Sequence, residues 1–275
     1  MTDSLNKLNR PIRVIVFSGG PVLERGVKQF LCRLDDHPEI DLLDCFCQSA
    51  NQSFKAVMRD LWRRRRLLSV PLLGIRIAGK AWRFLAHPRQ HRSLDKKISE
   101  LSNRIHYVPD IHAETVLECV REQNPDLGLI YGSPILRPEL FEIPKFGTLG
   151  IHHGKVPKYR GKKTTFWAVY YGEETAGVTI QKVNAGLDTG EIVKEGNVPI
   201  GSRSLRAVWN NLNKLGLDLY IQAILDIKHG KAHYQPQEGK KGRLYSDPRI
   251  KDILTLWWRQ LNRMSIGIYS RIISF

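Results

Sequence analysis

The sequence predicts an α/β fold, with a Rossmann-like, mostly parallel sheet that carries helices on both faces. Short runs rich in β-branched residues alternate with helical patterns along the chain. The first run, residues 13–17, ends in the turn Ser18-Gly19-Gly20, and this strand–glycine–helix opening is typical of a doubly wound domain. Apolar residues make up 42% and charged residues 25% of the 275 residues, which excludes a disordered or low-complexity chain.

The first half of the chain contains the elements that such a sheet requires. Strands are expected at residues 42–46, 104–108 and 127–131, with a helix at 113–122. Because strands and helices alternate, the strands should run mostly parallel. The helix expected after the glycine turn places these apolar residues roughly on one face: Val22, Val27, Phe30, Leu31 and Leu34.

The second half continues the alternation and has longer loops. A strand is expected at 148–152, followed by a basic loop with Pro and Gly at 155–163 and a helix at 164–171. Two more strands, at 177–183 and 192–198, enclose a glycine-bracketed loop. A short strand is expected at 243–245, with helix beyond it. Residues 204–228 predict a long amphipathic helix with one apolar stripe: Leu205, Val208, Leu212, Leu215, Leu219 and Ala223.

The net charge of +16 is concentrated in two segments. Residues 54–97 hold 13 Lys/Arg against 2 Asp/Glu, and residues 239–275 hold 8 against 2, so that the rest of the chain is nearly neutral. Both segments interleave cations with Trp, Leu or Phe, a composition that favours the surface of an anionic membrane over nucleic acid. Alternatively, their apolar stripes pack on the body or on a second copy in a homodimer. The tail stripe is Ile253, Trp257, Leu261, Met264, Ile268 and Ile272.

The sequence gives no sign of a disulfide framework, a metal site or a membrane span. The four cysteines form no CxxC pair, which argues against a cysteine-based zinc site. No apolar run reaches the roughly 18 residues that a membrane span needs, and the N-terminus has no apolar leader segment. We therefore expect a cytoplasmic protein.

Three features carry candidate chemistry. His152 and His153 stand at a strand end, where open α/β sheets place their sites, and adjacent strand residues point to opposite sides. At most one of the two histidines should therefore face a given cleft. Asp188, between two glycines, is either a turn residue or the carboxylate that orients an imidazole. The turn at residues 18–20 is either a tight turn or a phosphate site at a helix N-terminus.

Four motifs in register resemble the formyltransferase family that uses 10-formyltetrahydrofolate. They are the stretch from Gly150 to Gly161, the strand at residues 177–180, the loop at residues 185–190 and the segment at residues 125–140. The family hallmark is Asn-x-His, then a Pro-x-Tyr-Arg-Gly loop and a later Asp. His152 and Asp188 match its His and Asp in type and order. The resemblance covers residues 12–230.

The resemblance implies a formyltransferase fold and a one-carbon group transferase. Residues 11–230 would form the α/β domain, with a basic amphipathic insertion at about 54–97, and residues 231–275 a short C-terminal extension. The implied reaction transfers formyl from 10-formyltetrahydrofolate to the amine of a small acceptor such as an amino sugar. The basic loop at residues 155–163 either binds a phosphate of that acceptor or is simply solvated. His152 would stabilise the oxyanion of a tetrahedral intermediate, and Asp188 would orient it. The tail is too short for the β-barrel of the family's initiator-tRNA enzyme.

The resemblance also implies the binding residues. The formyl donor would contact one segment after the strand at 127–131 and another in the loop at 184–190: Ser133, Pro134, Ile135, Leu136, Asn184, Ala185 and Gly186. The acceptor would contact the first glycine turn and the basic loop: Ser18, Gly19, Gly20, Lys155, Tyr159 and Arg160.

One catalytic position departs from the family, because Gly150 stands where the family has Asn. In the family that amide donates to the formyl oxygen, and the loss of one such donor typically costs about 10²–10³ in rate. Gly150 therefore implies a compensating donor, a different reaction such as hydrolysis of the donor, or a non-catalytic folate- or membrane-binding relative. The candidate compensators are a water and these side chains: His153, Lys155, Lys162 and Lys163.

Overall fold

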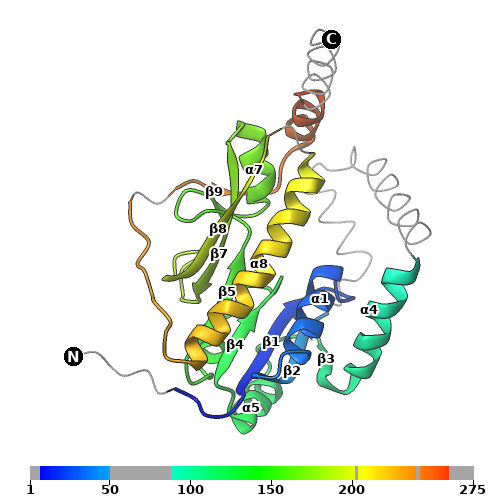
Figure 1. Ribbon diagram of the computed structural model, residues 1–275, viewed down its shortest axis with the longest axis vertical. Helices are drawn as coiled ribbons and strands as arrows, with labels where there is room; N and C mark the ends of the chain where they lie inside the picture. The colour runs from blue at the N-terminus through cyan, green and yellow to red at the C-terminus, as the bar shows by residue number, and fades with distance from the viewer. Residues whose placement is uncertain (1–6, 50–87, 202–203, 240–241, 260–275) are drawn as a thin grey trace.

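A computed structural model describes residues 7–49, 88–201, 204–239 and 242–259 (Figure 1). Its centre is a seven-stranded sheet in the order β3-β2-β1-β4-β5-β7-β8. The strands are β1 (Ile12–Gly19), β2 (Ile40–Gln48), β3 (Ile105–Val108), β4 (Leu127–Ile130), β5 (Thr148–His152), β7 (Thr175–Lys182) and β8 (Ile192–Pro199).

The sheet is mostly parallel, as the alternation of strands and helices predicts. Each adjacent pair in the row β3-β2-β1-β4-β5 is parallel, whereas β7 is antiparallel to both β5 and β8. In this register Phe17 of β1 lies beside Ile130 of β4, which lies beside Gly150 of β5. The carboxyl ends of these three strands therefore meet at one edge of the sheet, where α/β folds place their sites.

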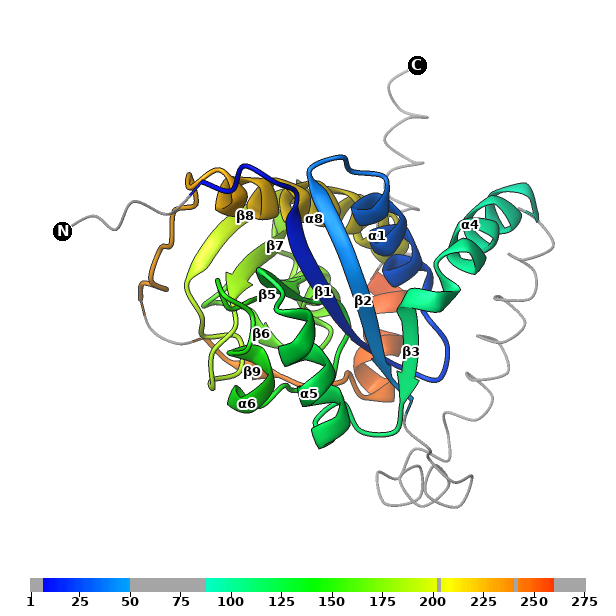
Figure 2. The same cartoon turned by 90° about the horizontal axis from the view of Figure 1, so that it is seen from below.

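Helices cover both faces of the sheet. Figure 2 shows α1 and α8 on one face and α5 and α6 on the other. Tyr220 of α8 is fully buried, and its hydroxyl donates to the carbonyl of Leu149 at 2.7 Å. This contact fixes α8 against β5. The helices are α1 (Arg25–Asp35), α4 (Pro88–Glu100), α5 (Glu114–Gln123), α6 (Pro138–Phe141), α7 (Thr164–Tyr171) and α8 (Leu205–Lys228).

Two segments differ from the sequence prediction. Val22 is not part of the first helix, which begins at Arg25, and its side chain is 65% exposed. The basic loop at residues 155–163 contains a two-residue strand, β6 (Arg160–Gly161), which pairs in parallel with β9 (Leu244–Tyr245). This partner lies more than eighty residues further along the chain, so the loop's own sequence carries no sign of the pairing.

Most of the two basic segments lies outside the described residues. Of the predicted insertion at 54–97, the structure describes residues 88–97, which belong to α4. In this helix Asp95 forms an ion pair with Lys28, and Lys97 forms one with Asp36. Residues 250–259 of the tail are helical, as expected, whereas Leu261, Met264, Ile268 and Ile272 are outside the described residues. Within the described part, no helix is long and apolar enough to cross a bilayer.

Candidate active site

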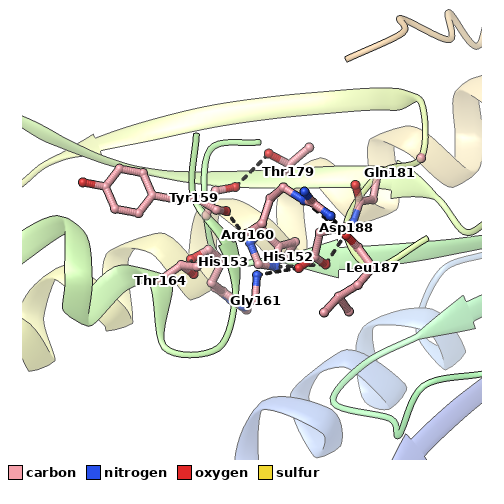
Figure 3. A network of polar contacts seen from close by, with 12 residues as sticks. His152, His153, Tyr159, Arg160, Gly161, Thr164, Thr179, Gln181, Leu187 and Asp188 are labelled. Carbon is pink, nitrogen blue, oxygen red and sulfur yellow. Dashed lines mark hydrogen bonds and ion pairs between the residues drawn. The ribbon is translucent and has the colours of Figure 1, made fainter. Parts of the chain in front are cut away.

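His152 ends β5, and both of its ring nitrogens face polar partners (Figure 3). Its Nε2 lies 2.8 Å from the carbonyl oxygen of Tyr159, and its Nδ1 lies 3.4 Å from Oδ1 of Asp188. Only 10% of its side chain is exposed. Because a carbonyl oxygen only accepts hydrogen bonds, Nε2 carries a proton. Nδ1 faces the carboxylate of Asp188, so the ring is held between these two partners.

Asp188 is held in place by the elements around it. Its backbone is left-handed, with φ of 51°, in the loop between β7 and β8. The N–H of Gly161 donates to its Oδ2 at 2.7 Å, and Nε2 of Gln181 donates to its Oδ1 at 3.3 Å. The β6–β9 pairing fixes Gly161, so the short strand that the sequence did not predict positions the carboxylate.

The loop that carries Asp188 is braced at several points. Asn184 accepts hydrogen bonds from the N–H of Gly186 at 3.0 Å and the hydroxyl of Thr189 at 2.8 Å, which closes a turn. The guanidinium of Arg160 donates to the carbonyl of Leu187 from Nε at 3.2 Å and Nη2 at 2.5 Å. Arg160 and Asn184, predicted to bind acceptor and donor, thus hold the loop that carries Asp188.

Gly154 allows the loop after β5 to turn directly beneath His152. A Cβ at this residue would lie 2.5 Å from Nε2 of His152 and 2.6 Å from the carbonyl oxygen of Tyr159. Real Cβ atoms essentially never approach so closely, so a side chain here would break this hydrogen bond or move the loop. The hydrogen bond that orients the imidazole therefore depends on the glycine.

His153 faces the opposite side of β5, as the strand alternation predicts. Its ring lies 4.4 Å from that of Trp209 in α8 and 6.5 Å from that of Tyr131, centroid to centroid. Burial, and then the neighbouring His152, lower its pKa to about 4. The ring is therefore neutral at physiological pH. It cannot supply the missing donor from the other face of the sheet.

The predicted donor and acceptor segments at β1 and β4 lie against one another. Ser18 is buried and donates to the carbonyl of Tyr131 at 2.9 Å. A Cβ at Gly19 would lie 3.0 Å from Cδ of Pro134, so the two turns are packed directly together. Gly20 follows with a positive φ of 124°, and its N–H donates to the carbonyl of Gln48.

Residues 133–136 present polar and apolar groups beside the site edge. The hydroxyl of Ser133 is buried and has no hydrogen-bond partner among the described residues. Ile135 is 74% exposed, whereas Leu136 is buried in a cluster that also includes Val183. An unpaired hydroxyl beside an exposed apolar side chain fits a flat ligand with polar edges.

Of the remaining predicted contacts, one is exposed and one has partners within the protein. Lys155 is exposed. The ring of Tyr159 stacks on that of Tyr245, 5.2 Å away, and its hydroxyl donates to Glu173 at 2.9 Å. In this structure Tyr159 thus contributes its backbone carbonyl to His152.

Two hollows flank the site. One, of about 400 Å³, is lined by residues 153–159 of the loop after β5 and by Gly177 of β7, among others. The other, of about 480 Å³, is lined by Phe141, Lys145, Lys182, Tyr234 and the predicted donor residues Asn184 and Ala185, among others. Gly186 continues the same loop. Among the described residues, no group of three His, Cys, Asp or Glu could hold a metal ion.

Two glutamines near the site are absent from the sequence prediction. Gln181 of β7 is 7% exposed and contacts Asp188. Gln237 donates to the carbonyl oxygens of Asp188 at 3.1 Å and Gly190 at 2.8 Å. A polar residue inside an apolar strand could have indicated Gln181, but nothing in the sequence places Gln237 near the loop.

Residues 91–224 match a known family, described as formyl transferase. This match spans β5, His152 and the Asp188 loop. Nearly half of the chain is therefore similar to the formyl transferase family, as the sequence motifs indicate.

Individual proteins with formyltransferase names are also similar to this chain. A methionyl-tRNA formyltransferase of Bacteroides fragilis is 27% identical over 187 residues, covering 66% of this chain and 56% of the relative. A sugar N-formyltransferase of a Shewanella species shares the fold, with a TM-score of 0.56 and 15% identity over 89% of this chain and 86% of that one. HypX of Aquifex aeolicus, solved with tetrahydrofolic acid, also shares the fold, with a TM-score of 0.55 and 14% identity. The match covers 89% of this chain and 33% of HypX.

The chain spans about half the length of the curated relatives it matches. The structural likeness confirms the predicted fold.

Proposed function

We propose that this protein transfers the formyl group of 10-formyltetrahydrofolate to the amine of a small acceptor. The observation that carries the proposal is the His152–Asp188 pair at the carboxyl end of β5, inside the segment that matches the family. The HypX structure with tetrahydrofolic acid supports a folate as the donor.

The residues near the pair fit such a donor. The unpaired Ser133 hydroxyl and the exposed Ile135 offer a polar and an apolar contact for a flat ring. A Cβ at Gly150 would meet only Cγ2 of Val183, at 3.5 Å, so there is room for a ligand beside β5. Residues 133–136 and 184–186 would hold the folate, which supplies the formyl group as a substrate.

The chain's own residues would act at the formyl oxygen. In the transfer, a bond forms between the acceptor nitrogen and the formyl carbon, the bond from that carbon to N10 of the folate breaks, and one proton moves from the acceptor nitrogen to N10. His152 would stabilise the negative charge that develops on the formyl oxygen. Asp188 would keep the ring protonated and oriented and assist the proton's passage.

We propose a phosphorylated amine, such as a nucleotide-linked amino sugar, as the acceptor. The basic loop that contains Lys155 supports an anionic ligand. The turn at residues 18–20 does not, because the first helix begins only at Arg25 and the N–H of Gly20 donates to the carbonyl of Gln48. The fold-level likeness to a sugar N-formyltransferase, of which this chain covers 86%, points to the same class.

The test follows a donor labelled in its formyl group. The purified chain is incubated with this donor and, separately, with a nucleotide-linked amino sugar, a small phosphorylated amine and an initiator methionyl-tRNA. We expect label in one of the two small amines and none with His152→Ala. Label that reaches only tRNA would contradict the proposed acceptor. Label released only as formate, or a donor left intact, would overturn the transfer reaction.

We further propose that the tail helix contacts an anionic membrane surface. Leu256 is buried against the body, and Arg259 donates to the carbonyl of Tyr170 at 2.9 Å, so one side of residues 250–259 is anchored. Its other side carries Leu254, Trp257 and Trp258, which are 55%, 62% and 62% exposed. The spacing i, i+3, i+4 puts these three on one helix face, and the tail around them is basic.

Sedimentation with vesicles tests this contact. The protein should bind vesicles that contain phosphatidylglycerol and detach as salt rises, because charges are screened over about 10 Å at 0.1 M salt. Trp257→Ala with Trp258→Ala should weaken binding, whereas Tyr107→Ser, which removes an aromatic ring 50% exposed on β3, should not. Equal binding to neutral vesicles, or lipid-independent self-association through the same tryptophans, would overturn the membrane proposal.

A further inference from the structure

The residue opposite Gly150 lies on the catalytic face of the sheet. β5 and β7 are antiparallel, and their register pairs Gly150 with Gln181 and His152 with Thr179. Residues directly opposite in an antiparallel pair project from the same face. A Cβ at Gly150 would meet Val183, two residues beyond Gln181, which agrees with this assignment. Gln181 thus projects on the side of His152, next to the space that Gly150 leaves.

Hydrogen bonds fix which end of the Gln181 amide faces the site. Nε2 of Gln237 donates to two backbone carbonyls, those of Asp188 and Gly190, and carbonyls only accept. The same nitrogen, which shares its two hydrogens among three acceptors, also lies 3.1 Å from Oε1 of Gln181. Because its oxygen is held by Gln237, the Gln181 amide turns its nitrogen toward Oδ1 of Asp188.

This nitrogen has donor capacity to spare. An amide nitrogen carries two hydrogens, and within the described residues Nε2 of Gln181 contacts a single acceptor, Asp188, at 3.3 Å. The side chain is only 7% exposed, so water reaches it poorly. A buried donor beside the His152–Asp188 pair, oriented in advance by a neighbour, is the kind of group that stabilises developing negative charge.

We propose that Gln181 donates a hydrogen bond to the formyl oxygen and so replaces the amide that Gly150 lacks. This inference rests on the proposed function and names one of its catalytic residues. The donor would reach the formyl oxygen from β7 instead of β5. The absence of a side chain at Gly150 leaves the space through which the longer glutamine can reach.

A pair of substitutions tests the replacement. Gln181→Met keeps the length of the side chain and removes the donor, and it should lower turnover of labelled 10-formyltetrahydrofolate by about 10²-fold, as expected for one lost donor. Adding Gly150→Asn to this variant should restore at least tenfold of the loss, because an amide would again project from β5. A purely structural role for Gln181 predicts no such rescue, and that result would overturn the proposal.

Two controls test whether a loss of turnover comes from removing any buried glutamine or from misfolding. Gln123→Met removes another partly buried glutamine that donates to an aspartate, Asp44, far from the site, and it should leave turnover unchanged. Thermal melting of each variant shows whether it folds. If Gln181→Met does not fold, Gln181→Glu serves instead: it keeps the shape, cannot donate when ionised, and should likewise be rescued by Gly150→Asn.

A second readout does not depend on turnover. The infrared carbonyl stretch of the bound, isotope-labelled formyl group should lie at lower frequency in the wild type than in Gln181→Met, because a hydrogen bond weakens the C=O bond. A shift without any turnover would contradict the proposed function but support the contact. Turnover with no shift and no rescue would overturn the contact alone. A chain that does not bind 10-formyltetrahydrofolate would overturn both.

Discussion

The two faces of β5 carry adjacent histidines in opposite surroundings. His152 meets a backbone carbonyl with one nitrogen and a carboxylate with the other. His153 lies against Trp209 of α8, and burial lowers its pKa to about 4. The strand alternation and the loops packed on each face, not the residue type, therefore give the two histidines different surroundings.

The largest expected effect on the rate is that of replacing His152. His152→Gln should lower the rate of formyl transfer by about 10³-fold or more, because it removes the charged donor and the proton relay. The ring is buried and hydrogen-bonded, so we also expect a loss of about 2 kcal/mol in the free energy of unfolding. Steady-state turnover and denaturant titration check both values. Unchanged turnover would remove His152 from the mechanism.

Asp188→Asn should lower turnover by about 10²-fold while the fold is kept. Asparagine can still accept the hydrogen bond from Gly161, and it tolerates the left-handed backbone of residue 188. It removes the negative charge that faces Nδ1 of His152. The discriminating measurement is kcat beside the dissociation constant of the donor: a loss confined to donor binding would contradict an orienting role.

Gly154→Ala should lower turnover by roughly tenfold or more, since a 1 Å misplacement of a catalytic group can cost about 10² in rate. The added carbon would collide with Nε2 of His152 and the carbonyl of Tyr159. Gly132→Ala is a control for glycine replacement, because a Cβ there meets nothing within 4 Å, although its backbone φ of 67° adds strain. Full activity of Gly154→Ala would show that the hydrogen bond to Tyr159 is dispensable.

The smallest effect belongs to His153 and concerns stability. With a pKa of about 4 when folded and about 6.5 when unfolded, the unfolded chain binds more protons between these pH values. The free energy of unfolding should therefore fall as pH drops from about 6.5 to about 4, by roughly 2 kcal/mol at most, because the ring is not fully covered. Denaturant titrations of wild type and His153→Gln measure this slope, and an equal slope in both would contradict the assignment.

The fold could be predicted largely because its signals are local. The β-branched run that became β1 and the apolar run that became α7, residues 164–171 as expected, show their structure within a few residues. β6 could not be predicted, because Arg160 and Gly161 pair with a segment far along the chain. Val22 was misplaced because hydrophobic spacing does not show where a helix begins.

The same distinction holds at the site. The motif led to His152 and Asp188, and alternation separated His152 from His153. The roles of Gly154, Gln181 and Gln237 depend on packing and on the register between β5 and β7, which no local pattern reports. Tyr159 shows the limit of motif reasoning, since its ring turns to Tyr245 while its carbonyl serves the histidine.

The most direct test of the central claim is a single-turnover measurement on a matched pair of variants. Wild type, His152→Gln and His153→Gln are each saturated with formyl-labelled 10-formyltetrahydrofolate and the best acceptor, and loss of label from the folate is followed in time. We predict that wild type and His153→Gln lose the label at similar rates, whereas His152→Gln binds the donor and retains it. Equal rates in the two variants, or a loss of activity only in His153→Gln, would contradict a catalytic face of β5 built on His152.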